Sequence, residues 1–167
     1  MFFRRKKSTV SKGGTVNTNR SDVRENVTMR VAIDADAAVR SWVYTQRTKL
    51  PDHLTPSPME ANQAIRRIKA TSFREVNLSA GGAKLVEYPG ATWVKHDRCT
   101  VMLSLDRDES TEVETILALP AEVVWAGDRV DGKHVAFNFL YENNTIHNYI
   151  HKFVQEQHRK RLRPREE

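Results

Sequence analysis

Apolar and polar residues alternate along much of the chain, and this alternation predicts strands. Between Val27 and Ile33 every second residue is apolar, which is the pattern of a strand with one buried face. We expect Arg24 and Arg30 on the polar face of this strand. A bend or bulge near residues 34–36 would allow the strand to continue through residues 39–43.

From residue 71 onward, short apolar segments are separated by turn-forming residues. The predicted strands are residues 73–78, 83–88, 99–105, 111–119, 121–125 and 134–139. The predicted turns are residues 81–82, 89–90, 106–110, 127–128 and 131–132, which are rich in glycine and aspartate. Several short strands at this spacing predict a mainly β chain, folded as a small antiparallel barrel or sandwich.

Two segments have helical spacing instead. After a loop that contains Pro51 and Pro56, the run Ser57-Pro58-Met59-Glu60 combines an N-cap serine, a first-turn proline and a glutamate three residues past the cap. Apolar residues then recur at helical spacing from Ala61 to Ile68, and again from Ile146 to Val154. We therefore predict a short inserted helix and a C-terminal helix.

The composition fits a single domain. The chain has 167 residues, of which 39% are hydrophobic, and a core of this length buries about two-thirds of the surface of the unfolded chain. One cysteine, Cys99, excludes a disulfide framework, and we expect it in the core. No apolar run approaches the roughly 20 residues that span a bilayer, and no apolar stretch follows the basic N-terminus as in a secretory signal. We expect a cytoplasmic protein.

The net charge of +6 is concentrated at the two ends of the chain. Residues 1–30 and 151–167 are basic, and the sequence between them is slightly acidic. Residues 1–19 are polar and basic and cannot bury enough apolar area to order themselves, so we expect a flexible arm. This distribution favours an anionic partner met by a terminal arm over a broad nucleic-acid-binding face.

Two short segments carry the side chains that a phosphate-bearing purine requires. The first is Arg20-Ser21-Asp22-Val23-Arg24, at the junction between the arm and the first strand. Its guanidinium groups can bind phosphate or hydrogen-bond the guanine edge. The second is Asn77-Leu78-Ser79-Ala80-Gly81-Gly82, where short polar side chains precede glycines that let a ligand lie against the backbone.

In this order the motifs resemble the PilZ domain family. The resemblance rests on Arg20-x-x-x-Arg24, on Asn77-x-Ser79-x-x-Gly82, and on the later strands at residues 121–125 and 135–139, and it covers residues 20 to about 160. It implies a six-stranded antiparallel β-barrel with a C-terminal helix, here with the short inserted helix as well. The arm would then be residues 1–19, the domain residues 20–160, and residues 161–167 a charged tail.

The resemblance also implies a ligand, the bacterial second messenger cyclic di-GMP. Arg20 and Arg24 would clamp its phosphates and guanine edges, and Asn77, Ser79 and Gly82 would receive a guanine on the barrel surface. Binding would fold the arm onto the barrel, which costs backbone entropy that the arginine contacts must offset.

Three features depart from the family pattern. Asn19 stands where the family often has a further arginine, which would favour one bound nucleotide over a stacked dimer. Residues 45–70 lengthen the connection between the two motifs. Arg30 also reads as the second arginine of the pair, but Asn26 then stands four residues before it, so we favour Arg20 and Arg24.

Other candidate residues carry weaker signals. Trp125, at a predicted strand end beside Gly127, is able to stack on a guanine but is more typical of a core or rim aromatic. His147 and His151 lie one turn apart on the predicted C-terminal helix, and without a third ligand they are typical of a surface rather than of a metal site. We expect no metal, no cofactor and no catalytic set, and so no enzyme.

Three functions remain open from the sequence. The leading one is a cyclic di-GMP receptor that acts on an unidentified protein partner in motility, adhesion or exopolysaccharide production, an output that only the resemblance implies. The second is a PilZ-like interaction module that binds no nucleotide and docks through the inserted helix. The third is a barrel that binds single-stranded nucleic acid, against which the acidic middle of the chain and its few aromatics count.

Overall fold

The structure is a computed structural model that describes residues 23–36, 40–46, 49–87, 92–105, 113–141 and 144–162. Its strands are β1 (Glu25–Met29), β2 (Val31–Asp34), β3 (Trp42–Thr45), β4 (Arg74–Ser79), β5 (Gly82–Glu87), β6 (Arg98–Ser104), β7 (Thr115–Arg129) and β8 (Gly132–Phe139). Its helices are the short 3-10 helix η4 (Asp52–Leu54), α1 (Pro58–Lys69) and α2 (Asn144–Leu162).

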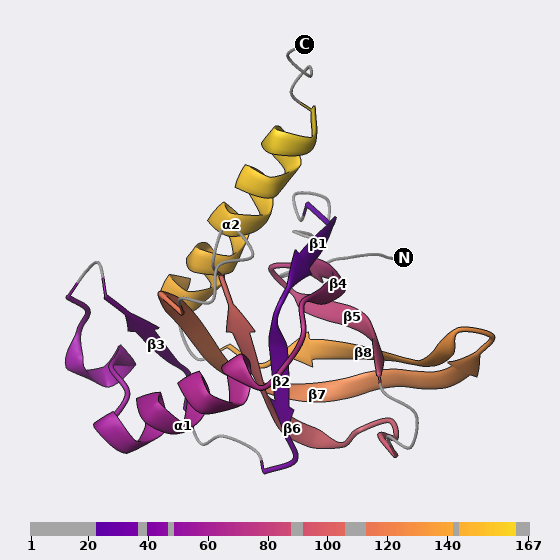
Figure 1. Ribbon diagram of the computed structural model, residues 1–167, viewed down its shortest axis with the longest axis horizontal. Helices are drawn as coiled ribbons and strands as arrows, with labels where there is room; N and C mark the ends of the chain where they lie inside the picture. Colours follow the sequence, from indigo (N-terminus) through magenta and orange to yellow (C-terminus); the bar gives the residue numbers. More distant parts are fainter. Residues whose placement is uncertain are drawn as a thin grey trace, which may run out of the picture.

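All the strands join one antiparallel sheet that curls into a half-barrel (Figure 1). The strand order is β1-β4-β5-β8-β7-β6-β2, and β3 pairs with β7 beside this path. The predicted mainly β class with one inserted and one C-terminal helix is confirmed. The sheet that the described residues form has eight strands, where the family resemblance implies six.

One source of the larger count is the first predicted strand, which is divided at Arg30. Before Arg30, β1 pairs with β4; after it, β2 pairs with β6 at the other end of the sheet. The chain therefore crosses between the two ends of the sheet at this residue. The expectation that Arg30 lies on a polar face is wrong: the residue is buried, and its guanidinium lies 4.8 Å from the ring centroid of Phe73. The change of pairing partner interrupts the alternation on which that expectation depended.

The long strand β7 differs from the sequence prediction in the opposite way. Residues 111–119 and 121–125 were predicted as separate strands, with a turn at Gly127, but a single strand runs from Thr115 to Arg129. Pro120 directly precedes Ala121, the first residue of β7 that pairs with β8. At this end of the pairing a missing N–H disturbs the ladder least. The hairpin turn is the later of the two predicted ones: residues 130–131 form it, and Gly132 follows with a φ of 134° that favours glycine.

Two hydrophobic clusters lie on opposite faces of the sheet. The larger one fills the concave side and includes Ile146, Ile150 and Phe153 of α2. The smaller one lies under α1, where Ala64 and Ile68 are buried with residues of β2, β6 and β7. Alternate residues of these three strands enter opposite clusters, so both of their faces are buried and they read as nearly continuous apolar runs.

Helix α1 begins as the sequence predicts. The Glu60 amide donates to Ser57 Oγ at 3.1 Å, and the Ser57 amide donates to Glu60 Oε1 at 2.8 Å, which completes the capping box. Cys99 lies in the core with a side chain that is fully buried, as expected. Among the described helices, none is long and apolar enough to cross a membrane.

A buried carboxylate joins the first strand to the last helix. Glu25 of β1 is 4% exposed and accepts hydrogen bonds from Arg161 Nε at 2.9 Å and Nη2 at 3.1 Å. It is also hydrogen-bonded to Nδ1 of His158, one turn earlier on α2. The hydrogen bonds from Arg161, and then that with His158, outweigh the effect of burial and hold the pKa of Glu25 below its ordinary value.

This lowered pKa makes the contribution of Glu25 to stability dependent on pH. The ionised carboxylate stabilises the fold above the ordinary glutamate pKa of about 4.3, and the contribution is lost as the pH falls through the lower pKa of the folded state. We expect Glu25→Gln to lower the melting temperature at pH 7, with a difference from the wild type that shrinks below about pH 4.

Thermal denaturation monitored by circular dichroism from pH 3 to pH 7 measures this difference. Glu75→Gln is the matched control, because Glu75 is an exposed carboxylate on the neighbouring strand β4. A Glu25→Gln deficit that stays constant over this range would show that the carboxylate charge does not hold α2 to β1.

Candidate functional site

Two rows of side chains run across the strands on the convex face of the sheet. The residues between them along the strands, such as Leu78, Ala83 and Phe137, point into the core, so the rows point outward. The first row is Asn26, Asn77, Lys84, Ala136 and Trp125, and the second is Ser79, Gly82, Asn138, Glu122 and Arg98. Residues more than 50 positions apart in the chain thus share one surface.

Arg24 lies at the β1 end of the first row. Its Nη1 donates to Oδ1 of Asn77 at 3.2 Å, and Nδ2 of Asn77 donates to Oδ1 of Asn26 at 2.9 Å. The pairing of β1 with β4 sets this contact, because it places Asn26 opposite Asn77. Strand register therefore brings the second arginine of the first motif to the asparagine of the second motif.

Ser79 and Gly82 form the floor beside Arg24 and Asn77. Ser79 is 1% exposed, and its hydroxyl donates to the Gly82 carbonyl at 3.5 Å. A Cβ atom at residue 82 would lie 2.1 Å from the carbonyl oxygen of Phe137 on β8. Gly82 is thus required for β5 to approach β8, and both residues shape the surface that a ligand would meet.

A cavity of about 520 Å³ opens above this floor. Its lining residues are Arg24, Ser79, Gly81, Gly82, Ala83, Lys84, Val124, Ala136, Phe137 and Asn138. Two of them are cationic and none is a carboxylate, so the cavity favours an anionic ligand. Its size is within the range of about 300–1,000 Å³ that is typical of small-molecule sites.

Trp125 lies at the far end of the first row, in the middle of β7 and not at a strand end as predicted. A register shift between Val123 and Trp125 places Val124 in the cavity lining. The indole ring, 36% exposed, lies 5.6 Å from Lys84 Nζ and 5.0 Å from the guanidinium carbon of Arg129. Both distances are short enough for cation–π attraction.

Comparisons with known proteins agree at the level of the fold. No family model matches the sequence, and no curated protein matches it significantly. Among solved structures, a tetrameric PilZ domain of Xanthomonas campestris, self-assembled through a helical bundle, superposes with a TM-score of 0.58 at 14% identity. That match covers 84% of this chain and 87% of the other. The chain folds as a PilZ-like domain.

A second solved structure supports the same fold. The inhibitor of motility MotI/DgrA of Bacillus subtilis superposes with a TM-score of 0.53 at 12% identity. The match covers 87% of this chain and 54% of MotI/DgrA, so this chain spans about half the length of that protein.

The PilZ-like fold brings together four of the six predicted site residues. Arg24, Ser79 and Gly82 line one cavity, and Asn77 is hydrogen-bonded to Arg24 beside it. Trp125 lies in the same cross-strand row as Asn77. Arg20 lies outside the described residues. The alternative second arginine, Arg30, is buried at the β1–β2 junction instead.

Sequence reasoning missed Lys84 and Asn138. The two-residue turn at 80–81 pairs Ser79 with Gly82 and therefore Asn77 with Lys84, so the hairpin register was a signal for Lys84. Asn138 lacked such a signal, because its place beside Gly82 depends on the pairing of β5 with β8, in which these two residues are 56 positions apart in the chain.

The histidine pair on α2 takes part in an aromatic row. His147 packs edge-on against Tyr141 with ring centroids 5.2 Å apart, and stacks on His151 at 6.2 Å. Within the part of the chain that the structure describes, no three histidine, cysteine or carboxylate side chains are grouped as metal ligands would be.

The close approach at Gly82 predicts a specific sensitivity. We expect Gly82→Ala to destabilise the fold by about 1–3 kcal/mol, because the added methyl group meets rigid backbone. Gly127→Ala is the comparison, since its Cβ would lie 2.8 Å from Cζ2 of Trp125, an atom of a half-buried side chain that can shift more easily than backbone. Urea denaturation of both variants measures the difference, and an equal loss of stability would contradict the role assigned to the β5–β8 approach.

Proposed function

We propose that this PilZ-like domain binds cyclic di-GMP in the cavity beside Arg24. The observation that carries the proposal is the Arg24–Asn77 contact at the edge of a cationic cavity floored by Ser79 and Gly82. These are the residues on which the sequence resembles the nucleotide-binding motifs of the family. Their meeting on one surface supports the proposal, because neither motif could form a site alone.

Three side chains in or beside the cavity have roles suited to this ligand. The planar fork of Arg24 binds a phosphate oxygen pair or the O6 and N7 atoms of guanine. Lys84 supplies a point charge for a phosphate, and the amide of Asn77 hydrogen-bonds a guanine edge. The hydrogen bond between Arg24 and Asn77 is exposed, and such a bond contributes about 1 kcal/mol net, so a ligand can replace it at small cost.

Arg20 completes the proposed site through the resemblance alone. It precedes Arg24 by four residues, and we propose that it binds the second phosphate of the dinucleotide. The asparagine at position 19 would then favour a single bound nucleotide.

We further propose that the domain is a receptor and not an enzyme. The cavity lining contains one hydroxyl, that of Ser79, and no histidine or carboxylate to activate it. The output would pass through a protein partner. The similarity in fold to a protein described as an inhibitor of motility supports this direction.

Isothermal titration of the full chain with cyclic di-GMP tests the site. We expect saturable binding that Arg24→Ala weakens at least tenfold, because charged hydrogen bonds of this kind contribute about 1.5–3 kcal/mol. Arg159→Ala is the matched control, because Arg159 is exposed on α2 and lies outside the cavity.

Asn77→Ala distinguishes binding at this site from a general attraction to positive charge. It leaves the net charge unchanged but removes the amide that is hydrogen-bonded to Arg24. Wild-type affinity in both Arg24→Ala and Asn77→Ala would overturn the proposed site. Absence of any heat or chemical-shift change with ligand would favour an interaction module that binds no nucleotide.

Trp125 provides a second, optical test. Stacking of a base on an aromatic ring contributes about 1–3 kcal/mol, so we expect Trp125→Ala to weaken cyclic di-GMP binding about fivefold or more. Tryptophan fluorescence should also change on titration and lose that change in Trp125→Phe. Unchanged affinity in Trp125→Ala would show that this residue does not contact the ligand and that its ring packs only against Lys84 and Arg129.

A further inference from the structure

A second basic cavity lies along the free edge of β2, the terminal strand at the opposite end of the sheet from β1. It measures about 500 Å³ and lies between this strand, the C-terminal end of α1 and the start of β4. Its lining residues are Val31, Ala32, Ile33, Arg66, Arg67, Ala70, Thr71 and Arg74. Three of them are arginines and none is a carboxylate.

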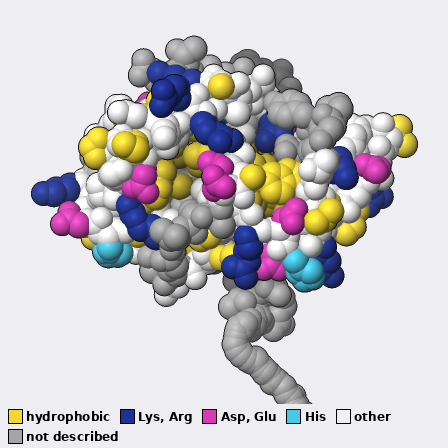
Figure 2. Space-filling model, turned by 90° about the horizontal axis from the view of Figure 1, so that it is seen from below, with side chains coloured by type: hydrophobic (Ala, Val, Ile, Leu, Met, Phe, Trp, Pro, Cys, Tyr) yellow, Lys and Arg dark blue, Asp and Glu magenta, His cyan; other side chains and the backbone are white. Residues whose placement is uncertain are grey.

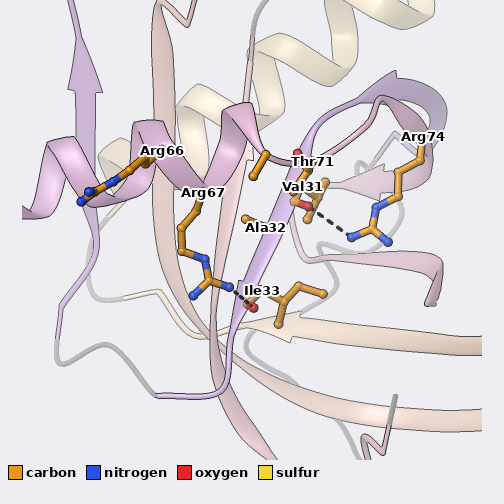
Figure 3. Close-up of a pocket in the computed structure, with 8 residues that line it drawn as sticks. Val31, Ala32, Ile33, Arg66, Arg67, Thr71 and Arg74 are labelled. Atoms are coloured by element: carbon orange, nitrogen blue, oxygen red, sulfur yellow. Dashed lines mark hydrogen bonds between the residues drawn. The ribbon is translucent and has the colours of Figure 1, made fainter. Parts of the chain in front are cut away.

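Two of the arginines donate hydrogen bonds to backbone carbonyls on the unpaired edge of β2. Arg67 Nη2 donates to the Ile33 carbonyl at 2.7 Å, and Arg74 Nη2 donates to the Val31 carbonyl at 3.2 Å (Figure 3). The Arg30 carbonyl, one residue before Val31, instead accepts from the amide of Ser104, the last residue of β6, as the alternation of an antiparallel strand requires. Guanidinium groups thus occupy positions that another strand would otherwise take.

The three arginines do not converge on one point. Figure 3 shows Arg67 and Arg74 reaching carbonyls two residues apart, while Arg66 points away from Arg74 along the helix. Among the described residues, no hydrogen bond or ion pair engages the Arg66 guanidinium. A compact phosphate needs converging donors, whereas positive charge spread along a strand edge and a helix end matches an extended anion.

Beside the cavity, one of these arginines already pairs with a carboxylate. Arg67 Nη1 lies 3.3 Å from Oδ2 of Asp34, and the side chains are 45% and 37% exposed. Exposed ion pairs of this kind are weak, so a carboxylate from another molecule can replace that of Asp34. Asp34 thus occupies the place that a partner's carboxylate would take.

The surroundings disfavour a nucleic acid. The adjoining cavity shares Arg66 and Arg67 but is also lined by Asp34, Asp36 and Glu60. These carboxylates repel an anion charged at every unit, as a nucleic-acid backbone is, more than a peptide whose carboxylates are separated by neutral residues. Figure 2, the view from below, shows blue and magenta side chains interspersed among the residues drawn in colour, without a continuous basic field. A strip of acidic side chains with neutral residues between them fits this mixed surface better.

We propose that Arg66, Arg67, Arg74 and the free edge of β2 form a docking surface for an extended acidic segment of a partner protein. The segment's carboxylates pair with Arg66 and Arg67, and the segment lies over the guanidinium groups that cover the strand edge. Arg74, which donates to the Val31 and Val86 carbonyls, adds positive charge to this surface. The surface is separate from the cyclic di-GMP cavity, so this proposal stands or falls independently of nucleotide binding.

Fluorescence anisotropy tests the surface with a fluorescein-labelled peptide of alternating glutamate and serine residues and the full chain, at low ionic strength where charge pairing is strongest. We expect Arg66→Glu to weaken peptide binding about fivefold or more, because it removes one attraction and adds one repulsion. Arg159→Glu, with the same charge change on α2, should weaken it less than twofold. Arg66→Gln should have an intermediate effect, and melting curves confirm that each variant is folded.

Amide chemical shifts locate the bound peptide. We expect the largest changes in ¹⁵N-labelled protein at Val31, Ile33 and Thr71. Equal losses in Arg66→Glu and Arg159→Glu, or shifts confined to α2, would overturn the proposal in favour of unspecific attraction to the basic ends. A ten-nucleotide oligothymidine that binds more tightly, with the same dependence on Arg66, would overturn it in favour of a nucleic-acid surface.

Discussion

The close approach of β5 to β8 at Gly82 is the constraint on which the candidate site depends. Because a Cβ at this position would lie 2.1 Å from the Phe137 carbonyl oxygen, the two strands can pair at this register only with a glycine. The register in turn aligns Asn77, Lys84, Ala136 and Trp125 across four strands. Gly82, which the motif associates with a ligand, is therefore needed for the pairing of β5 with β8 before any ligand is present.

The first strand connects this surface to the rest of the domain. On the outer side of β1, Asn26 is hydrogen-bonded to Asn77, which also accepts from Arg24, just before the strand. On the other side, Glu25 is held by Arg161 and His158 of α2. Consecutive residues of β1 therefore face the candidate site and the C-terminal helix. Arg24 directly precedes Glu25, the residue that anchors α2. A ligand that displaces Arg24 therefore acts next to the contact that holds this helix, which extends from the sheet in Figure 1.

The inserted helix α1 covers part of the sheet at the end opposite β1. It buries the outer face of β2, β6 and β7, which leaves these strands apolar on both sides. The same insertion supplies Arg66 and Arg67 beside the edge of β2. The convex face is thus divided between an open cationic cavity near β1 and a covered region with arginines at its margin.

The sequence alone determined the features that depend on neighbouring residues. Alternation located most strands, and the Ser57–Glu60 capping box located the start of α1. The two motifs gave Arg20, Arg24, Asn77, Ser79 and Gly82 as candidates for a site. The sequence did not determine where strands end or which ones pair, because pairing energy comes from residues far away in the chain. Pro120 and Gly127 resemble strand breakers locally but lie within β7, and Arg30 appears polar by alternation but is buried where the chain changes partners. Only tertiary packing could place Lys84, Asn138 and Trp125 on one surface, because strand register is a property of the whole sheet.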